Sequence, residues 1–229
     1  MDFNIYNVLI AFIPIVLAIT IHASAQAIAA KKYGDNTAFL QGRATLDPMK
    51  HIDLVGTIIV PTLIFATTGF IIGWAKPLSI NYSNLRKPRA DGIKVALSGA
   101  AANLLMAVAW ALLLGIVFFI QQTTISAIAE MPLIEGLLHI GMYGVSLNVF
   151  FCLFSLIPIP PLEGGRALRL ALAPKYNQQF NFLEQYGMFI VLGLAMIGVL
   201  AAVIRPIAAF IEGFIMLIPT IFIVLSKMV

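Results

Sequence analysis

The sequence contains very little charge. Only 10% of its 229 residues are Asp, Glu, Lys or Arg, whereas 61% are hydrophobic and the mean hydropathy is +0.99. A typical soluble domain has about a quarter charged residues, so this chain lacks the polar surface that a water-soluble globule needs. The composition therefore excludes an ordinary soluble protein and predicts an all-α polytopic membrane protein.

The chain contains a single cysteine, Cys152. One cysteine excludes a disulfide framework, and its position within an apolar run indicates a small core thiol. Acidic residues are also scarce, with 10 Asp and Glu against 14 Lys and Arg. The basic residues lie in short loops between apolar runs, which favours a role in membrane orientation and contact with anionic lipid headgroups rather than nucleic-acid binding.

The N-terminal segment lacks the features of a cleavable signal peptide. No Lys or Arg precedes Lys31, and the apolar run is longer than that of a signal peptide. Lys31 and Lys32 directly follow this run. We therefore expect an uncleaved first membrane span with its N-terminus outside the cell.

Long hydrophobic runs are abundant. A membrane-spanning helix needs about 20 apolar residues. Six runs come close to this length: Asn4–Ala30, Leu54–Gly73, Ile93–Ile120, Leu133–Ile157, Gly187–Val203 and Pro206–Leu225. Taken alone, they predict six spans in a single domain that covers residues 1–229.

The charged loops favour a different count. Loops 31–53 and 74–92 are both basic, yet they would lie on opposite sides of the membrane if Leu54–Gly73 crossed it fully. A re-entrant segment there would leave both loops in the cytoplasm, and Pro61 within the run fits this interpretation. We therefore favour five spans plus a re-entrant segment, with six spans as the alternative. The rough alternation of Lys76–Tyr82 predicts a short β element near the membrane surface.

Polar residues inside membrane segments cost free energy and usually have a function. His22 and Gln26 are four residues apart and share one helix face. Asn103 follows a run of small residues that allows another helix to approach closely. Glu163 follows Ser155 and the prolines that end a predicted span. The expected topology brings all of these to the cytoplasmic side, where they could form one pocket.

At this point the sequence resembles a known family. The segment from Val16 to Leu168 is similar to the site-2 protease family of intramembrane zinc metalloproteases, in its compact bacterial form. The resemblance rests on several motifs in the same order: Lys31–Asp35, Gly42–Pro48, His51–Asp53, Gly73–Pro77 and Pro158–Gly165. It implies a multi-pass protein of the cell membrane, in a bacterium the inner membrane.

The resemblance also implies a set of site positions. The family motif His-Glu-x-x-His supplies two zinc ligands and a general base, and a later aspartate supplies the third ligand. In this sequence the first histidine is retained as His22, the base position is Ala23, the second histidine position is Gln26 and the aspartate position is Glu163. Ser155 and Asn103 correspond to two family asparagines, of which only Asn103 is retained.

These substitutions weaken the family chemistry. A neutral amide such as Gln26 is a poor zinc ligand, and Ala23 cannot transfer a proton. His51 and His139 do not compensate in an obvious way. Two interpretations of His22 remain, an interhelical hydrogen bond without metal or a zinc ligand together with Glu163. Glu163 could also pair with Arg166, and Ser24 is expected to bond back to its own helix.

Two functions follow from the resemblance. The first is a catalytically impaired or inactive pseudoprotease that binds membrane segments of partner proteins, with zinc absent or weakly bound. The Lys76–Tyr82 element could then hold an extended peptide by adding it as a strand. The alternative is an active zinc-dependent endopeptidase with a divergent site. In both cases the implied surroundings are membrane lipid and the transmembrane segments of other proteins.

Overall fold

The computed structural model of the protein describes residues 5–53, 59, 76–123, 131–173 and 177–228. Its long helices are α1 (Ile5–Tyr33), α4 (Pro88–Thr123), α6 (Pro132–Ser155), α8 (Asn177–Met196) and α9 (Val199–Ile215). The shorter helices are α2 (Thr37–Leu40), η1 (Pro48–Lys50), η3 (Tyr82–Asn84), α7 (Glu163–Ala171) and α10 (Leu217–Ser226). The all-α prediction is confirmed for this part of the chain.

Local sequence explains where the long helices begin and end. Pro88 and Pro132 start α4 and α6, in a position where the missing amide hydrogen costs nothing. Helix α1 ends before Gly34, whose φ of 118° is accessible to glycine at little cost. The amide of Asp35 then donates to the carbonyl of Ala30 at 2.9 Å, which closes the last turn.

Within the described residues, four helical segments are long and apolar enough to cross a membrane. They are Ile10–Tyr33, Pro88–Thr123, Pro132–Ser155 and Val199–Ser226. Together with their exposed apolar side chains, such as Leu105 on α4 and Phe210 on α9, they form a multi-pass membrane protein.

The predicted number of spans is not confirmed by the described residues. Gly198 adopts a left-handed conformation with φ of 80°, so α8 ends at Met196 and α9 begins at Val199. This break divides the predicted span Gly187–Val203 between two helices. The predicted span Pro206–Leu225 instead lies within the single crossing Val199–Ser226. The predicted re-entrant segment Leu54–Gly73 lies outside the described residues, apart from residue 59.

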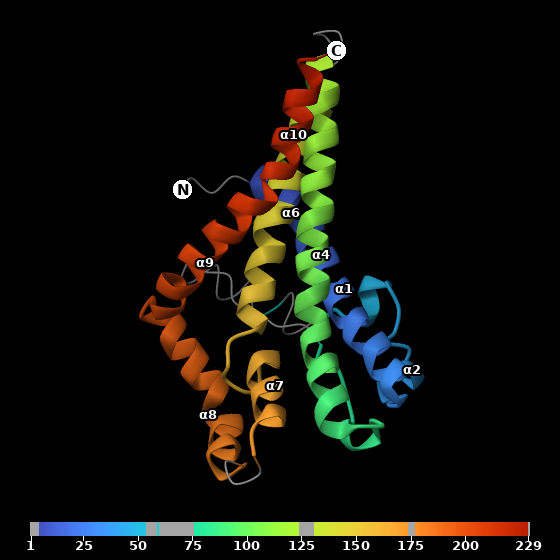
Figure 1. Ribbon diagram of the computed structural model, residues 1–229, viewed down its shortest axis with the longest axis vertical. Helices are drawn as coiled ribbons and strands as arrows, with labels where there is room; N and C mark the ends of the chain where they lie inside the picture. Colours follow the sequence, from blue (N-terminus) through green and yellow to red (C-terminus); the bar gives the residue numbers. More distant parts are fainter. Residues whose placement is uncertain (1–4, 54–58, 60–75, 124–130, 174–176, 229) are drawn as a thin grey trace.

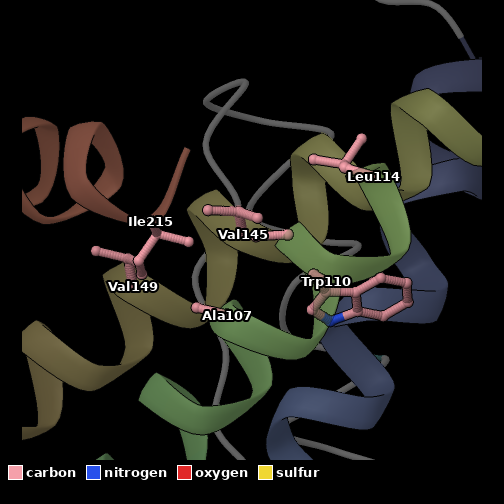
Figure 2. Close-up of a cluster of buried hydrophobic side chains, with 7 residues drawn as sticks. Ala107, Trp110, Leu114, Val145, Val149 and Ile215 are labelled. Atoms are coloured by element: carbon pink, nitrogen blue, oxygen red, sulfur yellow. The ribbon is translucent and has the colours of Figure 1, made fainter. Parts of the chain in front are cut away.

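The core is formed where α4 packs along α6. Ala107, Trp110 and Leu114 of α4 meet Val145 and Val149 of α6, with Ile215 of α9 at the same cluster (Figure 2). Glycines allow this close approach: a Cβ at Gly144 would lie 2.3 Å from the Trp110 ring. Figure 1 shows α1 beside this pair, α10 along the upper part of α4, and α7 near the lower end of α4.

The predicted β element at Lys76–Tyr82 is not found as a strand. Residues 76–81 have no regular secondary structure, and Tyr82 begins η3. Side chains and one backbone hydrogen bond, from the Lys76 amide to the His51 carbonyl at 3.0 Å, hold this segment in place of a neighbouring strand. Arg43 donates to the carbonyls of Lys76 and Pro77 at 2.9 and 3.3 Å, and Asp35 accepts from the Asn81 amide at 2.8 Å.

Candidate metal and binding site

Three helices bring the predicted site residues together. His22 and Gln26 lie on one face of α1, which packs against α4, and Glu163 begins α7, which packs against α4 as well. The His22 ring fits against α4 because Gly99 has no side chain there. A Cβ at Gly99 would lie 2.4 Å from His22 Nε2. The small residue at position 99 therefore fixes how deeply the imidazole sits between the helices.

The three family ligand positions are in mutual contact. His22 Nε2 lies 3.4 Å from Glu163 Oε1 and 3.4 Å from Gln26 Nε2. The Gln26 amide donates to Glu163 Oε1 at 3.3 Å and to the Ala96 carbonyl at 3.4 Å. These hydrogen bonds are long, since a typical N–H···O distance is about 2.9 Å. The polar atoms nevertheless meet at one point between α1, α4 and α7.

Asn103 completes the cluster from α4. Its amide nitrogen lies 3.2 Å from His22 Nδ1, and its side chain is almost fully buried. If Asn103 donates to Nδ1, the proton of a neutral imidazole lies on Nε2 and points to the Glu163 carboxylate. The Gln26 amide can donate to the same carboxylate. In this tautomer His22 donates to Glu163 and accepts from Asn103, while Gln26 donates to Glu163 and the Ala96 carbonyl. The 3.4 Å approach of Gln26 Nε2 to His22 Nε2 is then between two donors and is not a hydrogen bond.

The remaining predicted positions take no part in these contacts. Ala23 is buried on α1 and offers only a methyl group. Ser155 is buried at the end of α6, and its hydroxyl donates to the Cys152 carbonyl of its own helix at 2.9 Å. Arg166 forms no ion pair with Glu163 among the ion pairs of the described residues. Glu163 instead pairs with His22.

The side chains of Ser24 and His51 form a contact that the sequence did not reveal. Ser24 was expected to bond to its own helix, but its hydroxyl donates to the carbonyl of Thr45 and lies 3.3 Å from His51 Nε2. His51 Nε2 also lies 2.8 Å from the Thr45 carbonyl. Both side chains are fully buried, so they tie the loop after α1 to the helix that carries His22. Burial leaves no room for Ser24 to act as a nucleophile.

Two titratable side chains of this region, Glu163 and His51, have shifted pKa values. Burial tends to raise the pKa of Glu163, but its hydrogen bonds with His22 and the Gln26 amide leave it below the ordinary value. Burial lowers the pKa of His51, partly offset by its hydrogen bond to the Thr45 carbonyl. Glu163 is therefore held as a carboxylate, and His51 is held as a neutral imidazole.

The spacing of the cluster alone would suit a metal. Ligand atoms about 2.1 Å from a tetrahedral zinc lie about 3.4 Å from one another, and the three atoms here are 3.3–3.4 Å apart. The donor chemistry does not suit one. Gln26 presents its amide nitrogen, which cannot ligate, and turning the amide would place its oxygen against the oxygens of Glu163 and Ala96. No group of three His, Cys, Asp or Glu that could hold a metal occurs in the described ranges.

Comparison with known proteins identifies the family. The chain is 34% identical over 182 residues to the protein named "Putative zinc metalloprotease YwhC" of Bacillus subtilis (strain 168), covering 80% of this chain and 78% of that protein. This chain belongs to the site-2 protease family of membrane zinc metalloproteases. It is also 29% identical over 179 residues to "Putative zinc metalloprotease Rip2" of Mycolicibacterium smegmatis (strain ATCC 700084 / mc(2)155).

The second match covers 78% of this chain and 63% of Rip2. No model of a protein family matches the chain, and no solved structure matches it. Membership of the site-2 protease family and the four apolar helices agree with a multi-pass protein of the cell membrane.

Proposed function

We propose that this site-2 protease relative does not cleave peptide bonds by the family's zinc mechanism and that it binds membrane segments of other proteins. The observation that carries the proposal is the position of Gln26. Its amide nitrogen lies between His22, Glu163 and the Ala96 carbonyl, where the family has a second histidine. A hydrogen-bond donor at this point bonds the Glu163 carboxylate and leaves His22 as a single imidazole.

The base position supports the same conclusion. Ala23 has no group that can accept a proton from an attacking water. Loss of a general base alone costs about 10²–10⁴ in rate. Ser24 and His51 do not replace it, because both are fully buried and bonded to the Thr45 carbonyl. Neither the metal site nor the base of the family mechanism is present in its usual form.

The binding half of the proposal rests on the segment at 76–81. Its residues belong to no helix or strand, Asn81 at its end has an extended backbone, and Asp35 and Arg43 hold it from one side. Leu78, Ser79 and Ile80 line a cavity on the protein surface. An extended segment that is fixed on one side can accept a peptide backbone on the other. A partner protein whose membrane helix unwinds beside residues 76–81 could bind to this segment.

The alternative is an active zinc endopeptidase with a divergent site. The observation that favours it is the triangle of 3.3–3.4 Å between His22, Gln26 and Glu163. Zinc can also be bound by glutamate. The two functions differ in measurable metal content. We expect protein purified in detergent to contain far less than one zinc per chain, and equally little after His22→Ala.

A variant that carries the family residues at the site tests whether the protein fold can still form the family's zinc site. We expect the triple variant Ala23→Glu, Gln26→His, Glu163→Asp to bind about one zinc per chain. The same variant with His22→Ala added is the control and should lose the metal. Stoichiometric zinc in the unmodified protein, lost on His22→Ala and accompanied by hydrolysis of a membrane segment, would overturn the proposal.

Partner binding is tested by photo-crosslinking in cells. A photoreactive amino acid at Leu78 lines the cavity, whereas the same group at Leu105 points outward from α4 and serves as the control. We expect crosslinks from position 78, but not from position 105, to a membrane segment of a particular protein. A synthetic peptide of that segment should then remain intact with the unmodified protein in lipid vesicles. Identical crosslinks from both positions would argue against a binding site at 78–80.

A further inference from the structure

A second polar site lies beside the cluster around His22. An open cavity of about 430 Å³ is lined by residues 78–80, by Tyr82, and by residues of α7 and α8. Its polar lining comes mainly from Arg166 and Arg169 on α7 and from Glu184 on α8. Nothing in the family mechanism uses these groups.

The two arginines differ in how they are paired. Arg169 donates to the carboxylate of Glu184 and, at 3.0 Å, to the side-chain oxygen of Asn181, so its charge is compensated locally. Arg166, one helical turn away, has no acidic partner among the ion pairs of the described residues. The cavity therefore has an excess positive charge at Arg166.

Tyr82 places a hydroxyl group next to this charge. Burial and, to a smaller extent, the charge of Glu163 raise the pKa of Tyr82, while the charge of Arg166 and a hydrogen bond with its side chain act in the opposite direction. Arg166 and Tyr82 are therefore close together in the cavity wall. The hydroxyl of Ser79 belongs to the same lining. A guanidinium group and two hydroxyl groups can donate several hydrogen bonds to an oxyanion, and a guanidinium binds phosphate in a forked geometry.

The other side of the cavity is apolar. Leu78, Ile80 and Leu170 line it. The wall is packed against the first turns of α4: a Cβ at Gly92 would lie 2.8 Å from Leu170 and 3.1 Å from Tyr82. Because Pro88–Thr123 is a candidate membrane span, its first turns lie near one surface of the bilayer. The cavity thus combines anion-binding and apolar walls at the level of the lipid headgroups.

We propose that this cavity binds the phosphate of an anionic phospholipid, with Arg166 as the main contact and the apolar wall facing the glycerol and first acyl carbons. Neighbouring loops at this end of the molecule are basic, which matches the cytoplasmic leaflet, where anionic lipids are enriched. The lipid would share this cavity with a peptide held along residues 78–80, so we expect the two to exclude each other. The proposal does not depend on whether the protein cleaves peptides.

Lipid titration of the purified full-length protein tests the site. Delipidated protein in neutral detergent is titrated with phosphatidylglycerol, and bound lipid is counted by native mass spectrometry. We expect Arg166→Gln to weaken phosphatidylglycerol binding at least tenfold, and Arg166→Lys to weaken it less because the charge is kept. Arg89→Gln, which removes an exposed positive charge at the start of α4, is the matched control and should bind as the unmodified protein does.

Competitors distinguish the possible sources of the anion. Phosphatidylcholine should not displace phosphatidylglycerol, and inorganic phosphate should do so only weakly. Strong competition by inorganic phosphate alone would show a free-phosphate site, and stronger competition by a soluble acidic peptide would show a peptide site. Either result would overturn the lipid assignment, as would equal losses for Arg166→Gln and Arg89→Gln. Gel filtration and the melting temperature of each variant establish that it is folded.

Discussion

The imidazole of His22 rests directly against the backbone of Gly99. A Cβ at this glycine would lie 2.4 Å from Nε2 and 2.6 Å from Cε1 of the ring, closer than real Cβ contacts allow. The same Nε2 also lies 3.4 Å from Glu163 Oε1. The ring is therefore confined between a helix backbone and a carboxylate, so a change at position 99 should act on the cluster without altering any polar group.

We predict that Gly99→Ala displaces His22 from Glu163 and destabilises the protein. Overpacking of a close contact costs about 1–3 kcal/mol, and the melting temperature in detergent should fall accordingly. Gly213→Ala is the matched control, because a Cβ there meets nothing within 4 Å. It should leave the melting temperature unchanged or raise it slightly. Equal effects of the two substitutions would contradict the confinement of His22.

The hydrogen bonds of His22 predict its tautomer. Asn103 lies at Nδ1 and Glu163 at Nε2, so the neutral ring should carry its proton on Nε2. Nitrogen-15 NMR of protein labelled at histidine measures this directly. We expect Asn103→Leu to weaken the preference without abolishing it, because Glu163 still accepts from Nε2. A ring that is protonated on Nδ1 in the unmodified protein would contradict the network.

Arg43 is predicted to hold the extended segment at 76–81. Arg43→Ala leaves the carbonyls of Lys76 and Pro77 without their donor, which costs about 1–3 kcal/mol. Hydrogen exchange at the amides of Lys76 and Asn81 should accelerate about tenfold or more, since about 1.4 kcal/mol corresponds to a factor of ten. Arg89→Ala removes an exposed charge and should have no such effect. Unchanged exchange in Arg43→Ala would show that the segment is held by other contacts.

His51 predicts a pH dependence of stability. Burial lowers its pKa below the ordinary 6.5, so the folded protein keeps it neutral. As the pH falls below 6.5, the unfolded chain binds a proton that the folded chain does not, and the free energy of unfolding decreases. Its contribution is complete above pH 6.5 and falls by up to about 1.4 kcal/mol per pH unit below it, until the folded pKa is reached.

The comparison of the unmodified protein with His51→Gln between pH 7.5 and 5 isolates this contribution. Glutamine can still donate to the Thr45 carbonyl but does not titrate. The melting temperature of His51→Gln should therefore depend less on pH over this range. Parallel pH profiles for the two proteins would mean that other groups cause the dependence.

Part of the site could be predicted because it depends on the spacing of residues along one helix. A spacing of four residues on a helix places His22 and Gln26 on one face whatever the surrounding fold. The resemblance to the family then placed Glu163 and Asn103 in the same site. The contact of Ser24 with His51 and the burial of Arg43 could not be predicted in the same way. Both arise where the loop after α1 folds back, and no residue pattern encodes a loop path of this kind.

The span count shows what hydropathy alone cannot resolve. Gly187–Val203 is apolar throughout, but the left-handed Gly198 ends one helix and starts another inside it. Hydropathy predicts whether a segment lies in lipid, but it does not predict where the backbone changes direction. The strand predicted at Lys76–Tyr82 illustrates a related limit. Alternation favours an extended backbone, but a strand also needs a neighbour, and side chains of the preceding loop take that place.

The last crossing is the least attached to the rest of the protein. Only 11% of its most apolar window is buried inside the protein, against 39%, 39% and 33% for the other three spans. Its tilt should therefore follow the thickness of the surrounding bilayer more closely than theirs does. Helix α8 carries Glu184, which lines the cavity, and α8 is followed directly by this crossing. Membranes made from longer or shorter acyl chains should therefore alter the width of the cavity.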